Sequence, residues 1–225
     1  FTKTIELNPT CVRAYGNRGG AKIALKDYQG AIIDCTKAIE IDPDDAVAYN
    51  DRGAAKIALG DNSGGIADCT KSIDLNPAND DAYSNRGFAK LNLCDFQGSI
   101  ADCTKEIDLN PKHYLAYCIR GGAKARLGDF HGAIADCTKA LEIAPNSIAA
   151  YCDRAVAKIG LKDYQGAIAD CIRAIEIDSM CAEAYNNRGV AKHLLEDNSG
   201  ACEDFRKAGE LGNAHALELF KEYCQ

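Results

Sequence analysis

The chain has 225 residues and a formal net charge of −7, from 26 lysines and arginines against 33 aspartates and glutamates. This balance argues against nucleic acid as the main partner, because neutralising phosphates requires a basic surface. With no apolar run near the roughly 20 residues that cross a bilayer, we also expect no membrane partner.

The first two predicted helices span residues 12–25 and 29–41. Asp27 stands between them and is a suitable N-cap for the second helix. The second helix should end before Pro43, because proline cannot continue a helix and disfavours helical geometry in the residue before it. A short link between two helices of this length predicts an antiparallel hairpin.

This pattern recurs every 34 residues along the chain. Three charged positions follow the step, beginning at Arg18, Lys22 and Asp34 and ending at Arg188, Lys192 and Asp204. All five prolines keep the same step, namely Pro9, Pro43, Pro77, Pro111 and Pro145. A fixed period of this size predicts stacked supersecondary units rather than a closed globule.

The repeating unit resembles the tetratricopeptide repeat (TPR), and the residues that carry the likeness are Tyr15, Gly19, Tyr28, Ala31, Ala38 and Pro43. The resemblance implies an all-α fold, a right-handed α-solenoid of antiparallel helix pairs whose first helices line a concave groove. Proteins of this family usually bind protein segments there. We expect repeats at residues 12–45, 46–79, 80–113, 114–147, 148–181 and 182–213.

The two ends of the chain differ from the repeats. Residues 1–11 match the end of a second helix, so we expect a truncated preceding repeat. Residues 214–225 are amphipathic and should form a C-terminal capping helix, with Leu217, Phe220 and Cys224 against the sixth repeat.

The recurring charges fall on the packing face of the first helix. Arg18 and Lys22 share an arc with Tyr15, and an unpaired charge there would cost several kcal/mol. Asp34 is the obvious partner for either, within a repeat or across a repeat boundary. We therefore predict a ladder of ion pairs, one rung per repeat. The alternative, a stripe that binds anions, is disfavoured by the equal number of recurring aspartates.

The cysteines give little indication of a catalytic or metal-binding site. Of 12 in the chain, one group repeats every 34 residues without a CxxC partner: Cys35, Cys69, Cys103, Cys137 and Cys171. We interpret these as small buried residues in a reducing compartment, and we expect the protein to be cytoplasmic. No HExxH, P-loop or nucleophile elbow occurs, so we predict a non-catalytic protein without metal or cofactor.

Recognition should depend on the opposite arc of the first helices, where the repeats differ. That arc predicts a groove lined by Arg13, Asn17, Asn50, Asp51, Asp81, Asn85, Phe88, Arg126, Asp153, Glu183, Asn186 and Asn187. Asparagine both donates and accepts hydrogen bonds, so it can hold the main chain of an extended segment. Because acidic residues outnumber basic ones on this arc, the expected partner is a neutral or basic protein segment.

Two other hypotheses remain open. The chain could self-assemble as a structural array, a homo-oligomer through its N-terminal end, where the apolar side of Phe1 and Ile5 lacks a first helix to cover it. An enzyme or metal protein is less favoured, because an active site needs one cluster of reactive residues that is not repeated, whereas the charged residues of the 34-residue pattern recur in all six repeats.

Overall fold

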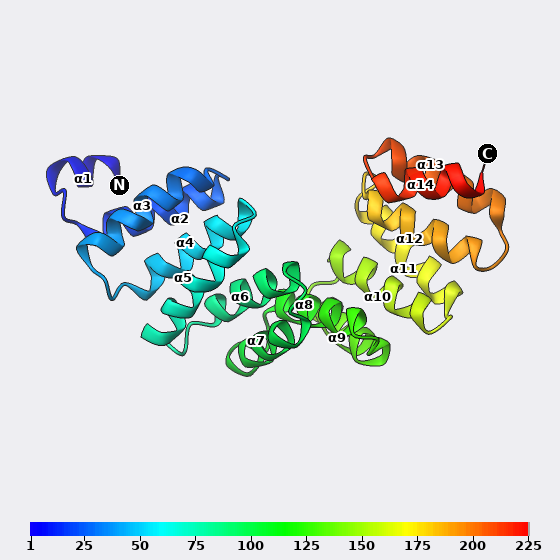
Figure 1. Cartoon of the computed structure of the whole chain (residues 1–225), viewed down its shortest axis with the longest axis horizontal. Helices are drawn as coiled ribbons and strands as arrows, with labels where there is room; N and C mark the ends of the chain where they lie inside the picture. Colours follow the sequence, from blue (N-terminus) through cyan, green and yellow to red (C-terminus); the bar gives the residue numbers. More distant parts are fainter. Residues whose placement is uncertain (225) are drawn as a thin grey trace. The chain divides into compact units, whose positions relative to one another are not determined.

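The structure is a computed structural model that describes residues 1–224, and these residues form fourteen α-helices (Figure 1). They divide into two compact units, Phe1–Pro111 and Lys112–Gln225, here called the N-terminal and C-terminal units. Among the described residues, no helix has both the length and the apolar character needed to cross a membrane. The all-α fold of consecutive antiparallel helix pairs, predicted from the sequence, is confirmed.

The N-terminal unit contains a short helix followed by three antiparallel hairpins. Its helices are α1 (Thr2–Leu7), α2 (Val12–Ala24), α3 (Tyr28–Ile41), α4 (Ala46–Ala58), α5 (Asn62–Leu75), α6 (Asp80–Asn92) and α7 (Phe96–Leu109). The hairpins are α2–α3, α4–α5 and α6–α7, and each packs on the next within this unit.

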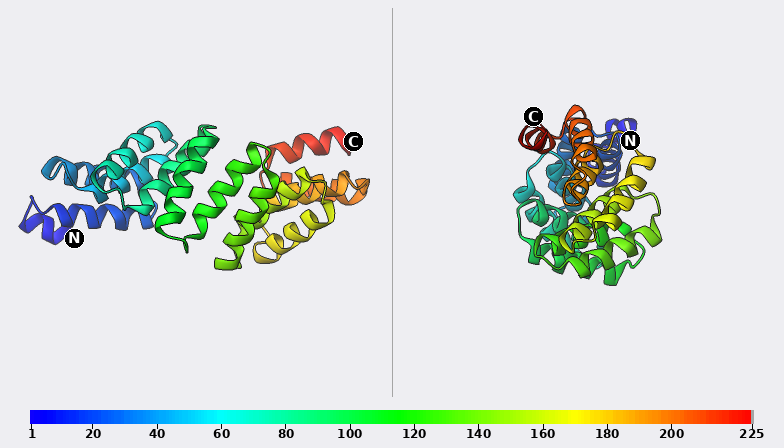
Figure 2. Two further views of the ribbon diagram at one scale, coloured as in Figure 1. Left: turned by 90° about the horizontal axis from the view of Figure 1, so that it is seen from below. Right: turned by 90° about the vertical axis from the view of Figure 1, so that its right-hand side faces the viewer.

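The C-terminal unit contains three further hairpins and a final helix. Its helices are α8 (Tyr114–Arg126), α9 (Phe130–Ile143), α10 (Ile148–Gly160), α11 (Tyr164–Ile177), α12 (Ala182–His193), α13 (Asn198–Glu210) and α14 (Ala214–Tyr223). Figure 2 shows the two helices of a hairpin running side by side in further views.

Each hairpin turn is built in the same way. Two residues after the first helix ends there is a residue with positive φ, which is Lys26 in the first repeat (φ 62°) and Gly60 in the second (φ 88°). The next residue, Asp27 in the first repeat, caps the second helix by accepting a hydrogen bond from the Gly30 amide at 3.0 Å. Glycine adopts positive φ without a steric penalty, whereas lysine does not, so Lys26 is held there by the turn.

Small residues allow the two helices of a hairpin to approach closely. The sulfur of Cys35 lies against Gly19, where an added Cβ would be only 2.6 Å away. All five periodic cysteines are fully buried, which confirms their predicted packing role. In the last repeat Phe205 takes the cysteine's place and lies against Gly189.

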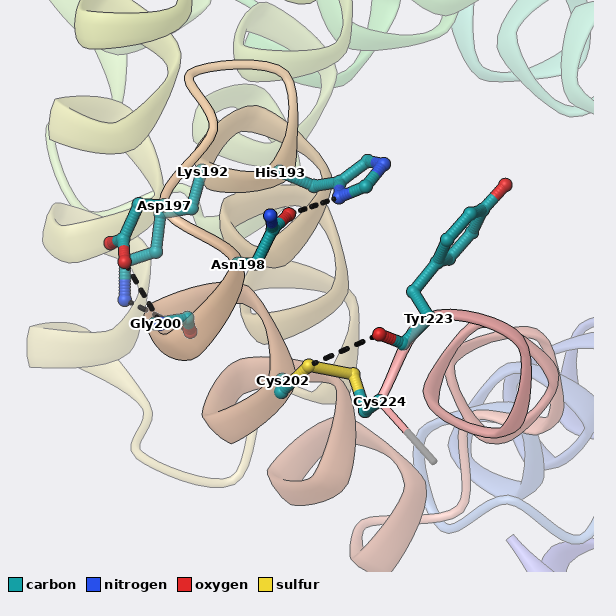
Figure 3. The surroundings of a disulfide bond; sticks show 8 residues. All are labelled: Lys192, His193, Asp197, Asn198, Gly200, Cys202, Tyr223 and Cys224. Carbon is teal, nitrogen blue, oxygen red and sulfur yellow. Dashed lines mark hydrogen bonds between the residues drawn. A yellow bond between two sulfur atoms is a disulfide. The ribbon is translucent and has the colours of Figure 1, made fainter.

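The final helix α14 occupies the position predicted for the capping helix and packs on α13. Ala216 is its buried residue, and Leu217 lies against Gly209. A disulfide joins Cys202 of α13 to Cys224, with 5.7 Å between the Cα atoms (Figure 3). This bond was not predicted from the sequence, because neither cysteine belongs to the 34-residue series.

Candidate functional site

The recurring charges form an ion-pair rung within each repeat. In the first, Arg18 Nη2 lies 2.7 Å from Asp34 Oδ1, and Lys22 Nζ lies 2.8 Å from Asp34 Oδ2. The same three-residue rung is present in the other repeats, at Arg52–Lys56–Asp68, Arg86–Lys90–Asp102, Arg120–Lys124–Asp136, Arg154–Lys158–Asp170 and Arg188–Lys192–Asp204. The predicted ladder is confirmed, and each aspartate takes both cations of its own repeat.

Each rung also contacts its surroundings through the arginine. The Arg52 guanidinium lies over the Tyr49 ring at 5.4 Å, close enough for a cation–π interaction. Its Nη1 donates to the hydroxyl of Thr36 in the preceding repeat at 3.3 Å, and Arg86 donates to Thr70 at 3.1 Å. The rung therefore stabilises the hairpin and links it to its neighbour.

The carboxylates of Asp34 and Asp68 are held ionised by their partners. Burial alone would raise the pKa of Asp34, but the hydrogen bonds from Arg18 and Lys22 outweigh it and keep the pKa below its ordinary value. The same balance lowers the pKa of Asp68. Since these cations already contact a buried carboxylate, the rungs belong to the wall of the fold and not to an anion-binding stripe.

A pocket lies on the opposite arc, between the first helices of the first two repeats. Its volume is about 490 Å³ and it is lined by Val12, Arg13, Gly16, Asn17, Gly20, Ala21, Asp45, Val47 and Asp51. Three of the predicted groove residues meet here, namely Arg13, Asn17 and Asp51. The glycines leave room beside them: no heavy atom lies within 4 Å of a Cβ placed on Gly16.

The electrostatics of this pocket centre on Asp51. Its pKa is raised to about 6, chiefly by burial and also by the charges of Asp45 and Asp81, while a hydrogen bond with Asn50 opposes the rise. Asp45 was not among the predicted groove residues. It is the N-cap of α4, accepting from the amides of Val47 and Ala48, and the capping signal in the sequence did not show that it would face the groove.

The other predicted residues of the N-terminal unit lie on α4 and α6. Asn50 is buried, and its Oδ1 accepts a hydrogen bond from Asn85 Nδ2 at 3.0 Å. Asp81 is exposed, and Phe88 is 44% exposed. The amides of Asn50 and Asn85 thus join neighbouring repeats as well as lining this arc.

The predicted residues of the C-terminal unit form an acidic and amide-rich patch. The pKa of Asp153 is raised to about 7, chiefly by burial and also by the charge of Glu183, while the charge of Arg126 opposes the rise. Asn187 is 7% exposed and its Oδ1 lies 3.4 Å from Asn186 Nδ2. Among the described residues, two buried amide atoms here have no hydrogen-bond partner, Asn186 Oδ1 and Asn187 Nδ2.

Repeated two-helix hairpins, each carrying its own ion-pair rung, define an α-helical repeat protein. Sequence models of the tetratricopeptide repeat match residues 12–45, 114–147 and 148–179. These matches, together with the repeated hairpins, support a tetratricopeptide repeat protein. Members of this family generally serve as non-catalytic scaffolds for protein–protein interaction.

Solved structures share the fold at low sequence identity. A chain in the APC/C hetero-tetramer Cut9–Hcn1 matches with a TM-score of 0.88 at 14% identity, over 100% of this chain and 45% of that one. PilW, a type IV pilus biogenesis factor, matches with a TM-score of 0.81 at 18% identity, over 92% and 97% of the two chains. YrrB, described as a TPR protein with an unusual peptide-binding site, has a TM-score of 0.64 at 21% identity, over 82% and 95%. No curated protein sequence matched the chain.

Proposed function

We propose that the chain is a non-catalytic scaffold that binds a neutral or basic protein segment along the variable arc of its first helices. The observation that carries this proposal is the pocket between α2 and α4, which brings Arg13, Asn17 and Asp51 together around about 490 Å³. A concave pocket with a few polar groups among small residues is the usual form of a binding site. The resemblance to YrrB, described as a TPR protein with an unusual peptide-binding site, is in keeping with it.

The charge of the pocket argues for a basic rather than an acidic segment. Asp45 and Asp51 line it against one arginine, Arg13. The raised pKa of Asp51, about 6, means that its carboxylate is costly to ionise without a cation nearby. A lysine or arginine of the partner would offset that cost, so binding would strengthen as Asp51 ionises.

A second feature supports main-chain recognition in the C-terminal unit. The buried atoms Asn186 Oδ1 and Asn187 Nδ2 have no hydrogen-bond partner among the described residues. A buried polar atom without a partner costs roughly 1–3 kcal/mol. An acceptor and a donor of this kind match the amide and carbonyl groups of an extended segment.

The test is a binding titration with fluorescein-labelled peptides of equal length that are basic, neutral or acidic. We expect the full chain to prefer the basic and neutral peptides. Asp51→Asn should weaken binding of the basic peptide by about 1–2 kcal/mol, which is about 5- to 30-fold in Kd. The affinity should also fall between pH 7.5 and pH 5, because Asp51 becomes protonated across its pKa of about 6.

The matched control is Asp74→Asn, which makes the same change in net charge on exposed Asp74 of the second helix α5. This variant should bind like the original chain. A preference for acidic peptides, or equal losses in the two variants, would contradict the proposal.

Self-association is a second proposal. Helix α1 buries none of its residues, and Phe1 and Leu7 are 58% and 80% exposed. Light scattering over a range of concentrations tests this: a mass that stays that of one chain would exclude it. The neutral-or-basic preference, the non-catalytic role and the cytoplasmic location all remain predictions.

A further inference from the structure

Two cysteine thiols of the C-terminal unit meet where the hairpin α10–α11 packs on the hairpin α12–α13. Cys152 lies on α10, and Cys181 is the residue that precedes α12. Their sulfur atoms are 3.9 Å apart. Both are free, although they are separated by 29 residues in the sequence. The two helices pack on each other in this unit.

We propose that Cys152 and Cys181 are a redox-active dithiol, which a small-molecule disulfide such as oxidised glutathione converts to a disulfide. The Cys181 thiolate attacks one sulfur of glutathione disulfide, forming a mixed disulfide and releasing one glutathione thiolate. Cys152 then loses its proton and attacks the Cys181 sulfur, forming the Cys152–Cys181 bond and releasing the second glutathione. The two protein thiols are oxidised, and glutathione disulfide is reduced to two glutathiones.

The surroundings assign the two roles. Cys152 is 1% exposed, whereas Cys181 is half-buried and follows a turn whose residues, 178–180, are all exposed. Cys181 is therefore the thiol that an oxidant can reach, and Cys152 is the one that resolves the intermediate. Burial raises the pKa of Cys152 well above its ordinary value, so this thiol stays protonated until its partner has reacted.

The remaining movement is small. A disulfide needs its sulfurs about 2 Å apart, so the two atoms must approach by about 2 Å. Cys181 stands at the end of the exposed turn as the N-cap of α12, where its carbonyl accepts one long hydrogen bond, of 3.4 Å, from the Tyr185 amide. A shift of its side chain and of the turn before it therefore disturbs at most this first bond of the helix. The bond would fasten the start of α12 to the middle of α10.

The preceding repeat supplies a natural control. Cys118 occupies the position of Cys152, and Ser147 occupies the position of Cys181. The separation between Cys118 Sγ and Ser147 Oγ is also 3.9 Å. The two sites therefore share their geometry and differ in chemistry, because a serine cannot complete a disulfide. Serine is also accommodated at this position, so Cys181→Ser should fold.

The experiment treats the full chain with oxidised glutathione, alkylates the free thiols and maps tryptic peptides by mass spectrometry. We expect a linked pair of peptides, residues 140–154 with residues 174–188, and an alkylated Cys118. Oxidation should raise the melting temperature by about 5–10 °C more in the original chain than in Cys181→Ser. In a Cys152→Ser chain, Ser147→Cys should create a new link between residues 113–120 and 140–154.

Two outcomes overturn the proposal directly. It is wrong if Cys152 and Cys181 are fully alkylated under conditions in which Cys202–Cys224 is closed. It is also wrong if Cys152 becomes linked to a cysteine other than Cys181. When the chain is fully reduced before the treatment, the Cys202–Cys224 bond serves as an internal measure that oxidation took place, because it re-forms in both the original chain and Cys181→Ser.

Discussion

Removing the carboxylate from one rung by Asp68→Asn should lower the free energy of unfolding by about 3 kcal/mol. Three charge-assisted contacts end on this side chain: Arg52 Nε at 2.9 Å, Arg52 Nη2 at 2.7 Å and Lys56 Nζ at 2.8 Å. Breaking a buried ion pair costs about 3–5 kcal/mol, because the remaining charge stays buried. The side chains of Arg52 and Lys56 are 17% and 25% exposed, so water reaches them and the lower end of that range applies.

The loss should appear as a fall in melting temperature of about 6–12 °C for a chain of this size. Urea denaturation followed by circular dichroism gives the free energy itself. The control is Lys37→Gln, which breaks an exposed pair whose side chains are 49% and 57% exposed. We expect it to change stability by at most about 0.5 kcal/mol.

The pH dependence gives a second readout. The pKa of Asp68 is lowered in the folded chain, so its contribution is present above the unfolded pKa of about 4 and is lost as the pH falls through the folded value. The difference between the original chain and Asp68→Asn should therefore shrink below about pH 4. A loss under about 1 kcal/mol at pH 7, or one no larger than that of Lys37→Gln, would refute the assignment of the rungs to the wall of the fold.

Three other outcomes follow from the structure. Folding raises the pKa of Asp51 to about 6, so ionisation of its carboxyl lowers the stability of the folded chain as the pH rises from about 4 through 6. In urea titrations, Asp51→Asn should therefore be more stable than the original chain at pH 8, by up to about 3 kcal/mol, and no more stable at pH 4. Gly189→Ala should lower stability by about 1–3 kcal/mol, because its Cβ would lie 2.7 Å from the buried ring of Phe205. Gly16→Ala has open space around it and should raise stability by up to about 1 kcal/mol. Calorimetry measures both changes. In the oxidised chain, Cys202→Ser should lower stability by about 3 kcal/mol and speed amide exchange in α14, and unchanged exchange there would argue against the link.

The hairpins and the rungs could be predicted from the sequence because both depend on short spacings within one repeat. Arg18 and Lys22 are four residues apart on one helix, and their partner Asp34 follows at a constant distance in every repeat. Periodicity then distinguishes the packing face from the groove, because residues that hold the hairpins together recur in every repeat, whereas residues of the groove differ between repeats. The pairing itself required the structure, because the sequence left open whether Arg18 or Lys22 pairs with Asp34, and Asp34 binds both.

Other features depend on distances that no periodicity reveals. Asp45 reaches the pocket because the cap of α4 lies beside α2, and Asn187 is buried by the packing of its neighbours. Cys152 and Cys181 meet because repeats stack, so that an offset of 29 residues becomes a contact. Such relations arise from tertiary packing, and the sequence of a single repeat does not contain them.

The rungs also determine how such an array can change its length. Each aspartate is paired with the arginine and lysine of its own repeat, so a duplication or deletion of one whole hairpin adds or removes all three charges together. A break between the two helices would instead leave two cations without their carboxylate. The arginine's hydrogen bond to the preceding threonine, as from Arg52 to Thr36, can form again after any repeat that carries this threonine, whereas the fifth repeat has Ile172 at that position. The electrostatics of the wall thus make the complete hairpin the unit by which this family of arrays can grow or be engineered.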